Sequence, residues 1–189
     1  MIRPKMINRS ILAALGAGVL GTAIALSGSS QATVSTAEST GANSSVPPGL
    51  EVPAGNVPIA VLSAQGVQVY QCTASAWVFL EPAASLAGRT TTRPRSNQTA
   101  VHFRGPSWES TKDGSLVQAA SVASSPVPGS IAELLLKATV NRGDGIFGKV
   151  SYIQRLHTTG GAAPAGACVD GKTTGVPYTA QYRFYAPAS

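Results

Sequence analysis

The 189-residue sequence has little of the material from which most catalytic and metal sites are built. It contains two histidines, two cysteines and two tryptophans, and only 12% of its residues are charged. Neither His102 nor His157 has a partner at the H-x-H or H-E-x-x-H spacing that fixes the geometry of a metal site. No G-x-S-x-G motif provides an activated serine. We therefore expect neither a metal nor a cofactor.

The sequence also lacks a dense block of basic residues outside its N-terminus. The formal net charge is +6, but Arg3, Lys5 and Arg9 account for three of the positive charges, so the remainder carries +3. The densest later run, Arg89, Arg93 and Arg95, lies among threonines and a proline and is typical of a solvated loop. This pattern gives no support to a nucleic-acid partner.

The N-terminus has the three parts of an export signal. The basic start is followed by an uncharged apolar run over Ile11–Leu26, and Ser30-Gln31-Ala32 places small residues where a signal peptidase reads them. We expect residues 1–32 to be a signal peptide that is cleaved near Ala32, giving a secreted or periplasmic protein with no stable membrane anchor. An uncleaved anchor is the alternative, because the apolar run approaches the length of a membrane span.

Cys72 and Cys168 are the only cysteines, and an even count in an exported chain indicates a disulfide. Two free thiols or a metal pair are the alternatives. The Asn43 and Asn97 tripeptides are glycosylation acceptors only if the host glycosylates exported proteins.

The rest of the chain predicts a single all-β domain. Residues 33–50 are rich in Ser, Thr and Pro and are interpreted as a flexible lead-in, so the domain covers 51–189. Short apolar runs separated by Gly and Pro favour an antiparallel β-sandwich or barrel with long loops. Alternation is clearest over 66–72 and 178–185. Residues 81–99 are expected to be a long excursion with a short helical turn near 83–86, and residues 131–140 suit either a helix or a strand.

The stretch from His102 to Ser115 concentrates the candidate functional residues. It contains His102, Glu109 and Asp113, which are candidates for acid–base or ligating roles. Turn signals at Gly105-Pro106 and Asp113-Gly114 predict that residues 106–114 form an exposed turn region that displays Trp108 and Glu109. Arg104 and Trp108, together with His157 from another strand, are the candidate binding residues.

Aromatic residues offer a second route to a site. A pocket for a sugar or another apolar-faced ligand is one interpretation of them, and an ordinary hydrophobic core is the other. The residues in question are Tyr70, Trp77, Trp108, Tyr178, Tyr182 and Phe184.

Several motifs in combination resemble a secreted bacterial and fungal family known as domain-of-unknown-function family 3455. They are residues 66–72 followed by Trp77, residues 102–109 with 113–115, residues 152–161 with Pro164 and Cys168, and residues 176–180. The resemblance spans about residues 48–186, and it implies secretion, a single domain and a Cys72–Cys168 link. It supplies no activity and no catalytic residues. Some fungal relatives carry a malate dehydrogenase label, but the part of this chain after the signal segment has no nucleotide-binding glycine loop.

These observations favour a secreted, non-catalytic binding or surface module. Its partner would be an unknown small molecule, a glycan or a cell-envelope component. The alternative is a secreted hydrolase or metal-dependent enzyme that uses His102, Glu109 and Asp113.

Overall fold

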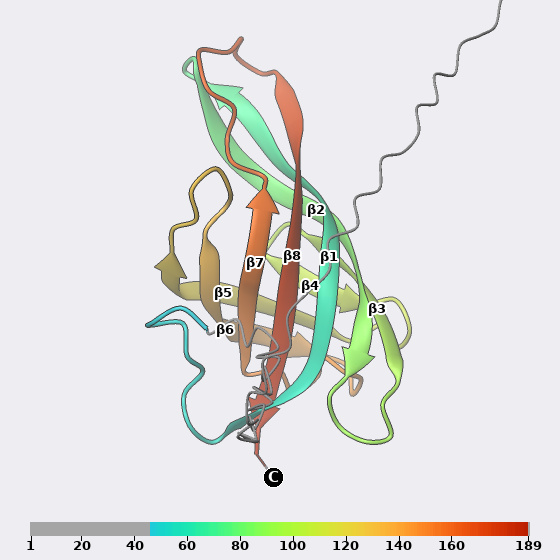
Figure 1. Cartoon of the computed structure of the whole chain (residues 1–189). Helices are drawn as coiled ribbons and strands as arrows, with labels where there is room; N and C mark the ends of the chain where they lie inside the picture. The colour runs from blue at the N-terminus through green and yellow to red at the C-terminus, as the bar shows by residue number, and fades with distance from the viewer. Residues whose placement is uncertain (1–45, 189) are drawn as a thin grey trace, which may run out of the picture. The chain divides into compact units, whose positions relative to one another are not determined.

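The computed structural model describes residues 46–188, which form one closed antiparallel barrel of eight strands (Figure 1). The prediction of an all-β domain is confirmed, and of the two architectures considered the barrel is the one observed. The strands are β1 Asn56–Thr73, β2 Ala76–Thr90, β3 Asn97–Phe103, β4 Ser107–Ser110, β5 Leu116–Ser125, β6 Glu133–Arg142, β7 Tyr152–Gly160 and β8 Thr173–Pro187.

The topology is a simple meander. Each strand pairs with the next along the chain, and β8 pairs with β1 to close the ring. In Figure 1 the β1–β2 hairpin and the start of β8 project beyond the end of β7. We call this the open end of the barrel, and the end that carries the β6–β7 connection the closed end. A barrel of eight strands has an interior just wide enough to be filled by side chains or to hold one small ligand.

Two glycines allow the long β1–β2 ribbon to coil. A Cβ atom on Gly66 would lie 2.2 Å from the carbonyl oxygen of Ala83, and one on Gly88 would lie 2.1 Å from that of Val61. Only glycine permits backbones to approach this closely, and glycine positions of this kind commonly mark the bends at which a sheet closes into a barrel.

The expected excursion over 81–99 is wrong in its first half, because β2 continues to Thr90. Proline normally interrupts a strand, but the register of the β1–β2 pair shifts between Val69 and Tyr70, leaving Leu80 as an extra residue shortly before Pro82. The helical turn expected near 83–86 is absent for the same reason. Residues 131–140, which suited either a helix or a strand, lie mostly in strand β6.

The exposed turn region expected over 106–114 is also corrected. Residues 107–110 form strand β4, in which Trp108 is 1% exposed. Trp108 pairs with His102 on β3 and with Val117 on β5, so it shares their inward face. The two turn signals are real, but they bound a short buried strand instead of one exposed loop.

The closed end is filled by side chains. Phe147 and Val150 of the β6–β7 connection enter the core beside Leu62 and Phe184, and the Phe147 and Phe184 rings lie 4.7 Å apart. The Asn141 amide holds this connection by donating to the carbonyl oxygens of Phe147 and Val150 at 2.8 and 3.1 Å. The connection therefore plugs the barrel.

A smaller apolar cluster lies on the outer face. Leu50, which the sequence analysis assigns to the lead-in, is 1% exposed and packs with Leu135 and Leu156. Gln154 donates a hydrogen bond of 2.6 Å to the Leu50 carbonyl oxygen. The expected signal peptide at 1–32 and residues 33–45 of the lead-in lie outside the described residues. Within 46–188, no helix has the length and apolarity needed to cross a membrane.

The disulfide between Cys72 and Cys168 is confirmed, with a Cα–Cα distance of 5.8 Å and a sequence separation of 96 residues. Backbone hydrogen bonds surround it, from Cys72 N to Lys172 O and from Gly171 N to Cys72 O. The bond therefore ties the end of β1 to the β7–β8 connection at the open end.

Candidate functional site at the open end of the barrel

The open end contains a cavity of about 610 Å³ inside the barrel. Its outer wall is mainly apolar and is formed by Phe79, Leu80, Pro82, Ile131, Leu134 and Leu136. Most of its polar and aromatic lining comes from five other strands, namely Gln68, Tyr70, His102, Trp108, Arg155 and Tyr182. A mostly apolar pocket of this size with a few converging polar groups is typical of small-molecule sites.

His102 and Trp108 form the inner wall. Their rings stack with centroids 4.2 Å apart and planes 7° apart, and Tyr182 meets both rings edge-on. His102 Nδ1 lies 2.8 Å from the Ser107 carbonyl oxygen. A carbonyl oxygen only accepts, so Nδ1 carries the proton and Nε2 is left as an acceptor.

His102 is neutral at physiological pH. Burial lowers the pKa of its imidazole to about 3; the hydrogen bond to Ser107 opposes this shift, and the charge of Arg155 adds to it. A group this difficult to protonate is a poor general base near neutrality. The ring therefore serves as a planar wall and a hydrogen-bond acceptor.

Two buried donors on residues that line the cavity have no hydrogen-bond partner within the part of the chain that the structure describes. They are the indole Nε1 of Trp108 and the amide Nε2 of Gln68, on side chains of residues that are 1% and 2% exposed. Leaving a buried donor unpaired costs about 1–3 kcal/mol. Because buried polar groups in native proteins are nearly always hydrogen-bonded, these two groups indicate a partner outside the chain, such as water or a ligand.

Arg155 brings a positive charge to the cavity. On β7 it pairs with Leu134 of β6 and Tyr182 of β8, so its side chain belongs to the inward face. Its Nε and Nη2 atoms both donate to the Ala132 carbonyl oxygen, at 3.0 and 2.8 Å. Burial raises the pKa of Tyr70 and Tyr182, and the charge of Arg155 partly offsets both shifts. The tyrosines stay protonated at neutral pH.

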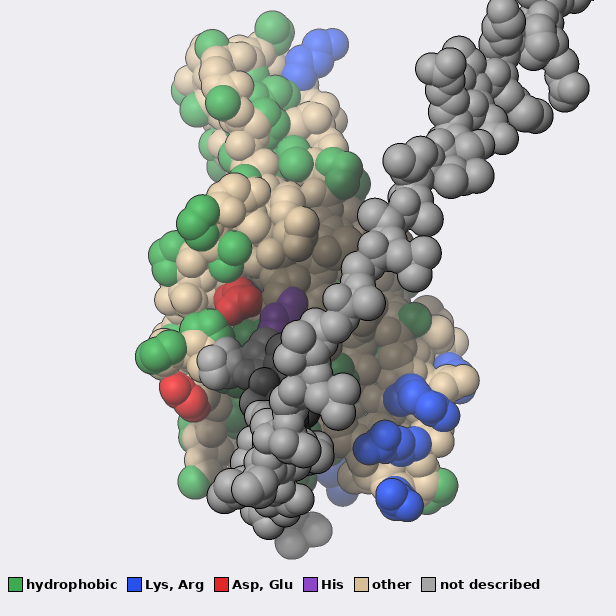
Figure 2. All heavy atoms as spheres, viewed as in Figure 1, with side chains coloured by type: hydrophobic (Ala, Val, Ile, Leu, Met, Phe, Trp, Pro, Cys, Tyr) green, Lys and Arg blue, Asp and Glu red, His purple; other side chains and the backbone are tan. Residues whose placement is uncertain are grey.

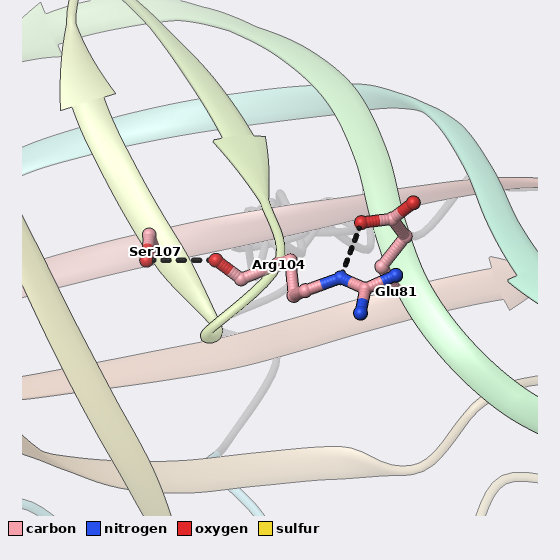
Figure 3. Close-up of polar contacts among 3 residues, drawn as sticks. All are labelled: Glu81, Arg104 and Ser107. Carbon is pink, nitrogen blue, oxygen red and sulfur yellow. Dashed lines mark hydrogen bonds and ion pairs between the residues drawn. The ribbon is translucent and has the colours of Figure 1, made fainter.

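The rim is marked by one ion pair. Arg104, in the β3–β4 turn, reaches across to Glu81 on β2 with Nε and Oε2 3.0 Å apart, and Ser107 Oγ donates to the Arg104 carbonyl oxygen (Figure 3). The Arg104 side chain is 63% exposed. Of the candidate binding residues, Arg104 and Trp108 thus both line the cavity, one at the rim and one inside.

The three candidate catalytic residues do not share a surface. His102 faces into the barrel, whereas Glu109 pairs with Val101 on the outward face. Asp113 lies in the β4–β5 turn, where its carboxylate accepts hydrogen bonds from Ser115 N, Ser115 Oγ and Ile146 N at 2.9, 2.6 and 3.1 Å. Partial burial opposes the shift, but the Ser115 and Ile146 hydrogen bonds outweigh it and lower the pKa of Asp113. The turn carboxylate therefore anchors the plug of the closed end.

His157 belongs to a different surface from His102. It is exposed, adopts a φ of 52°, and its backbone nitrogen donates to Glu133 Oε1. Its side chain borders an outer groove of about 760 Å³ over β8, β1, β2 and β3. None of the described residues that line this groove has a buried polar atom without a partner. We therefore regard the smaller inner cavity as the better site.

On the face drawn in Figure 2, basic side chains gather mainly in one region. Figure 2 shows hydrophobic side chains over the projecting β1–β2 hairpin, and Lys and Arg side chains gathered near β3. The β2–β3 loop, residues 91–96, contains Arg93 and Arg95, as expected for a solvated loop. Val78, Phe79 and Val169 are 50%, 51% and 69% exposed. Phe79 also lines the cavity, so the apolar surface continues into it.

Gln68, Tyr70, Arg155 and Tyr182 are site residues that the sequence analysis did not single out as a set. The signal was present in the strand over 66–72, whose alternation places Gln68 and Tyr70 on the same face as Cys72, opposite the valines. The structure turns this polar face inward. Because this strand buries its glutamine more deeply than its valines, the interior that it faces is not purely apolar.

Within residues 46–188, no group of three or more His, Cys, Asp or Glu side chains is placed to hold a metal ion. No curated protein and no solved structure matches the chain. The family model described as a protein of unknown function (DUF3455) matches residues 53–186, which include every described residue that lines the cavity. The chain therefore belongs to the DUF3455 family.

Proposed function

We propose that this protein is an exported binding protein whose barrel holds one small, largely apolar molecule at its open end. The observation that carries the proposal is the 610 Å³ cavity, two of whose lining residues, Gln68 and Trp108, each carry a buried donor that has no partner among residues 46–188. A ligand that filled the cavity would cover its apolar wall and accept hydrogen bonds from Trp108 and Gln68.

The design of the barrel supports this function. The closed end shows that the chain can fill the barrel with large side chains such as Phe147 and Phe184. At the open end the interior positions carry Gln68 and Arg155 instead. Polar groups that reduce stability inside a barrel are understandable if they act on a ligand, because functional sites are commonly placed at the expense of stability.

The alternative, a hydrolase or metal-dependent enzyme using His102, Glu109 and Asp113, finds less support in the geometry. The three side chains have different environments: the barrel interior, the outer face and a structural turn. Concerted acid–base or metal chemistry needs its groups within reach of one reacting atom. A binding role asks only for the cavity.

Export is part of the proposal. It is supported by the basic and apolar N-terminal pattern and by the disulfide, since disulfides persist in oxidising compartments. N-terminal sequencing of protein recovered outside the cytoplasm tests it, with Thr33 as the expected first residue. Recovery of the protein beginning at its initiator methionine and retained in the membrane would contradict cleavage.

Binding is tested by titrating the purified protein with a panel of aliphatic and aromatic acids, alcohols, amines, short glycans and cell-wall fragments. Trp77→Phe leaves Trp108 as the only tryptophan, so its indole N–H resonance reports on the cavity wall alone. We expect at least one class to shift this resonance in a saturable way. A panel without any binder would contradict the proposal.

A matched pair of variants locates the ligand. Ser121→Phe places a ring at the edge of the inner cavity, while Ser63→Phe places the same ring in the outer groove. We expect Ser121→Phe to weaken binding by about tenfold or more, since it removes about 1.4 kcal/mol of ligand contact. Ser63→Phe should leave binding unchanged. The opposite result would move the site to the outer groove.

A further inference from the structure

The charges and donors around the cavity narrow the ligand to one chemical class. We propose that the barrel binds a small amphipathic anion, a carboxylate on an aliphatic or aromatic body, with the carboxylate held by Arg155, Trp108 and Gln68. This inference rests on the proposed binding function and adds the nature of the ligand to it.

The cavity has an excess of positive charge. Its lining includes Arg104 and Arg155, and none of the described residues that line it is an Asp or Glu. Among residues 46–188 the one ion pair joins Arg104 to Glu81. Arg155 therefore has no described carboxylate within 4 Å, although a partly buried guanidinium is normally paired.

The polar groups around the cavity include more donors than acceptors. Trp108 Nε1 and the guanidinium of Arg155 can only donate, and Gln68 Nε2 is a donor without a partner among residues 46–188. His102 Nε2 is a lone-pair site that cannot offset a positive charge. A carboxylate offers two oxygens with about four acceptor positions, and charge-assisted hydrogen bonds to such oxygens are the strong ones.

The apolar part of the cavity lies apart from its polar groups. The polar groups lie on inward positions of β1, β4 and β7, whereas Phe79, Leu80, Pro82, Leu134 and Leu136 form an apolar wall. Half-exposed Phe79 lies at the mouth. An apolar body can thus lie along this wall while the anionic group faces Arg155. A free inorganic anion or a sugar would leave the wall uncovered.

The test compares three probes with one body: octanoate, octanol and octylamine, below their micelle concentrations. In the Trp77→Phe protein we expect octanoate to bind about tenfold or more tightly than octanol, and octylamine to bind most weakly, as charge-assisted pairing in a desolvated site requires. Octanoate should also move the Trp108 indole N–H downfield more than octanol does.

Arg155→Met, with Arg183→Met as its matched control, tests the residue itself. Arg183 lies on the outward face of β8, next to Tyr182 in sequence, and bonds to Gln181. Arg155→Met should abolish the preference for octanoate over octanol, and Arg183→Met should retain it. If Arg155→Met does not fold, Arg155→Lys serves instead, and should reduce the preference because lysine lacks the guanidinium fork.

The outcomes separate the two levels of the proposal. Equal binding of all three probes, or a preference kept in Arg155→Met, would overturn the anionic class while the barrel remained a binding site. Failure of the whole panel to bind would overturn the proposed function as well. Tighter binding of octylamine than octanoate would also overturn the class, because it would require a negative site.

Discussion

The two ends of the barrel solve the same packing problem in opposite ways. At the closed end Phe147, Val150 and Phe184 fill the interior, and the loop that carries Phe147 is held by Asn141 and Ser115. At the open end the interior keeps a cavity of about 610 Å³, and the side-chain nitrogens of two lining residues, Gln68 and Trp108, have no partner in the described part of the chain.

The difference teaches where this chain places stability and where it places chemistry. Filling an interior with side chains and pairing every polar group maximises the free energy of unfolding. The open end gives up part of both gains within the same eight strands. The packed closed end and the candidate site at the open end thus lie one above the other in the same barrel. Equivalent substitutions at the two ends should change the free energy of unfolding by different amounts.

The largest expected effect is at the closed end. Phe147→Ala removes a fully buried ring that contacts Phe184, and should lower the free energy of unfolding by about 3–5 kcal/mol. Leu134→Ala at the open end should lower it by less than half as much, because this side chain is only partly buried and already borders a cavity. Urea unfolding followed by circular dichroism measures both. Equal losses would mean that the open end is as tightly packed as the closed end.

Next in size is the covalent link at the open end. Replacing Cys72 and Cys168 together with serine should lower the free energy of unfolding by about 2–4 kcal/mol, since the bond closes a loop of 96 residues. The same unfolding experiment measures it, and wild-type protein treated with a reductant is the control. A loss below about 1 kcal/mol would show that the backbone hydrogen bonds around Lys172 hold this end without the bond.

Much of the frame could be predicted from the sequence because it depends on local patterns. Alternation identified the terminal strand, whose Tyr178, Ala180, Tyr182 and Phe184 do share the inward face. The disulfide followed from an even cysteine count.

The site was harder to predict because it depends on which face closes inward. Trp108 lies between two turn signals, which predict an exposed side chain. Closure of the barrel instead places it inside, opposite His102. Arg155 gave no sign of lining a cavity, since a lone arginine in a strand is usually on the outer face. Pro82 and Gly88 made the second half of β2 unrecognisable as a strand. The bulge that accommodates Pro82 and the close backbone approach at Gly88 both depend on pairing with β1, which the local sequence does not reveal.

The buried His102 on the inner wall of the cavity should make stability depend on pH. Its pKa of about 3 in the folded protein is below the value of about 6.5 expected after unfolding, so the unfolded chain binds one more proton between these values. Above pH 6.5 His102 is neutral in both states and does not reduce stability. As the pH falls from 6.5 toward 3, protonation of His102 in the unfolded chain increasingly favours unfolding. The free energy of unfolding should therefore decrease by up to about 1.4 kcal/mol per pH unit below pH 6 through this residue.

The measurement compares urea unfolding at pH 7, 6 and 5 for the wild-type protein, His102→Gln and His157→Asn. The slope should be reduced in His102→Gln. The variant His157→Asn, in which asparagine tolerates the positive φ at that position, measures how much of the slope depends on the second histidine. An unchanged slope in His102→Gln would show that water in the cavity hydrates the imidazolium. His102 would then belong to the solvated cavity and not to the packed core.

The smallest effect is the sharpest test of the comparison, because it predicts opposite signs for one kind of change. Gln68→Met removes a buried amide whose nitrogen has no partner among the residues that the structure describes, so the free energy of unfolding should rise by up to about 1 kcal/mol while ligand binding weakens. Asn141→Leu removes an amide that bonds two carbonyl oxygens of the plug, so stability should fall by about 1 kcal/mol. Both are read from urea unfolding at pH 7. A loss of stability in Gln68→Met would mean that its amide already supports the barrel, and the open end would then be a second structural layer of the fold.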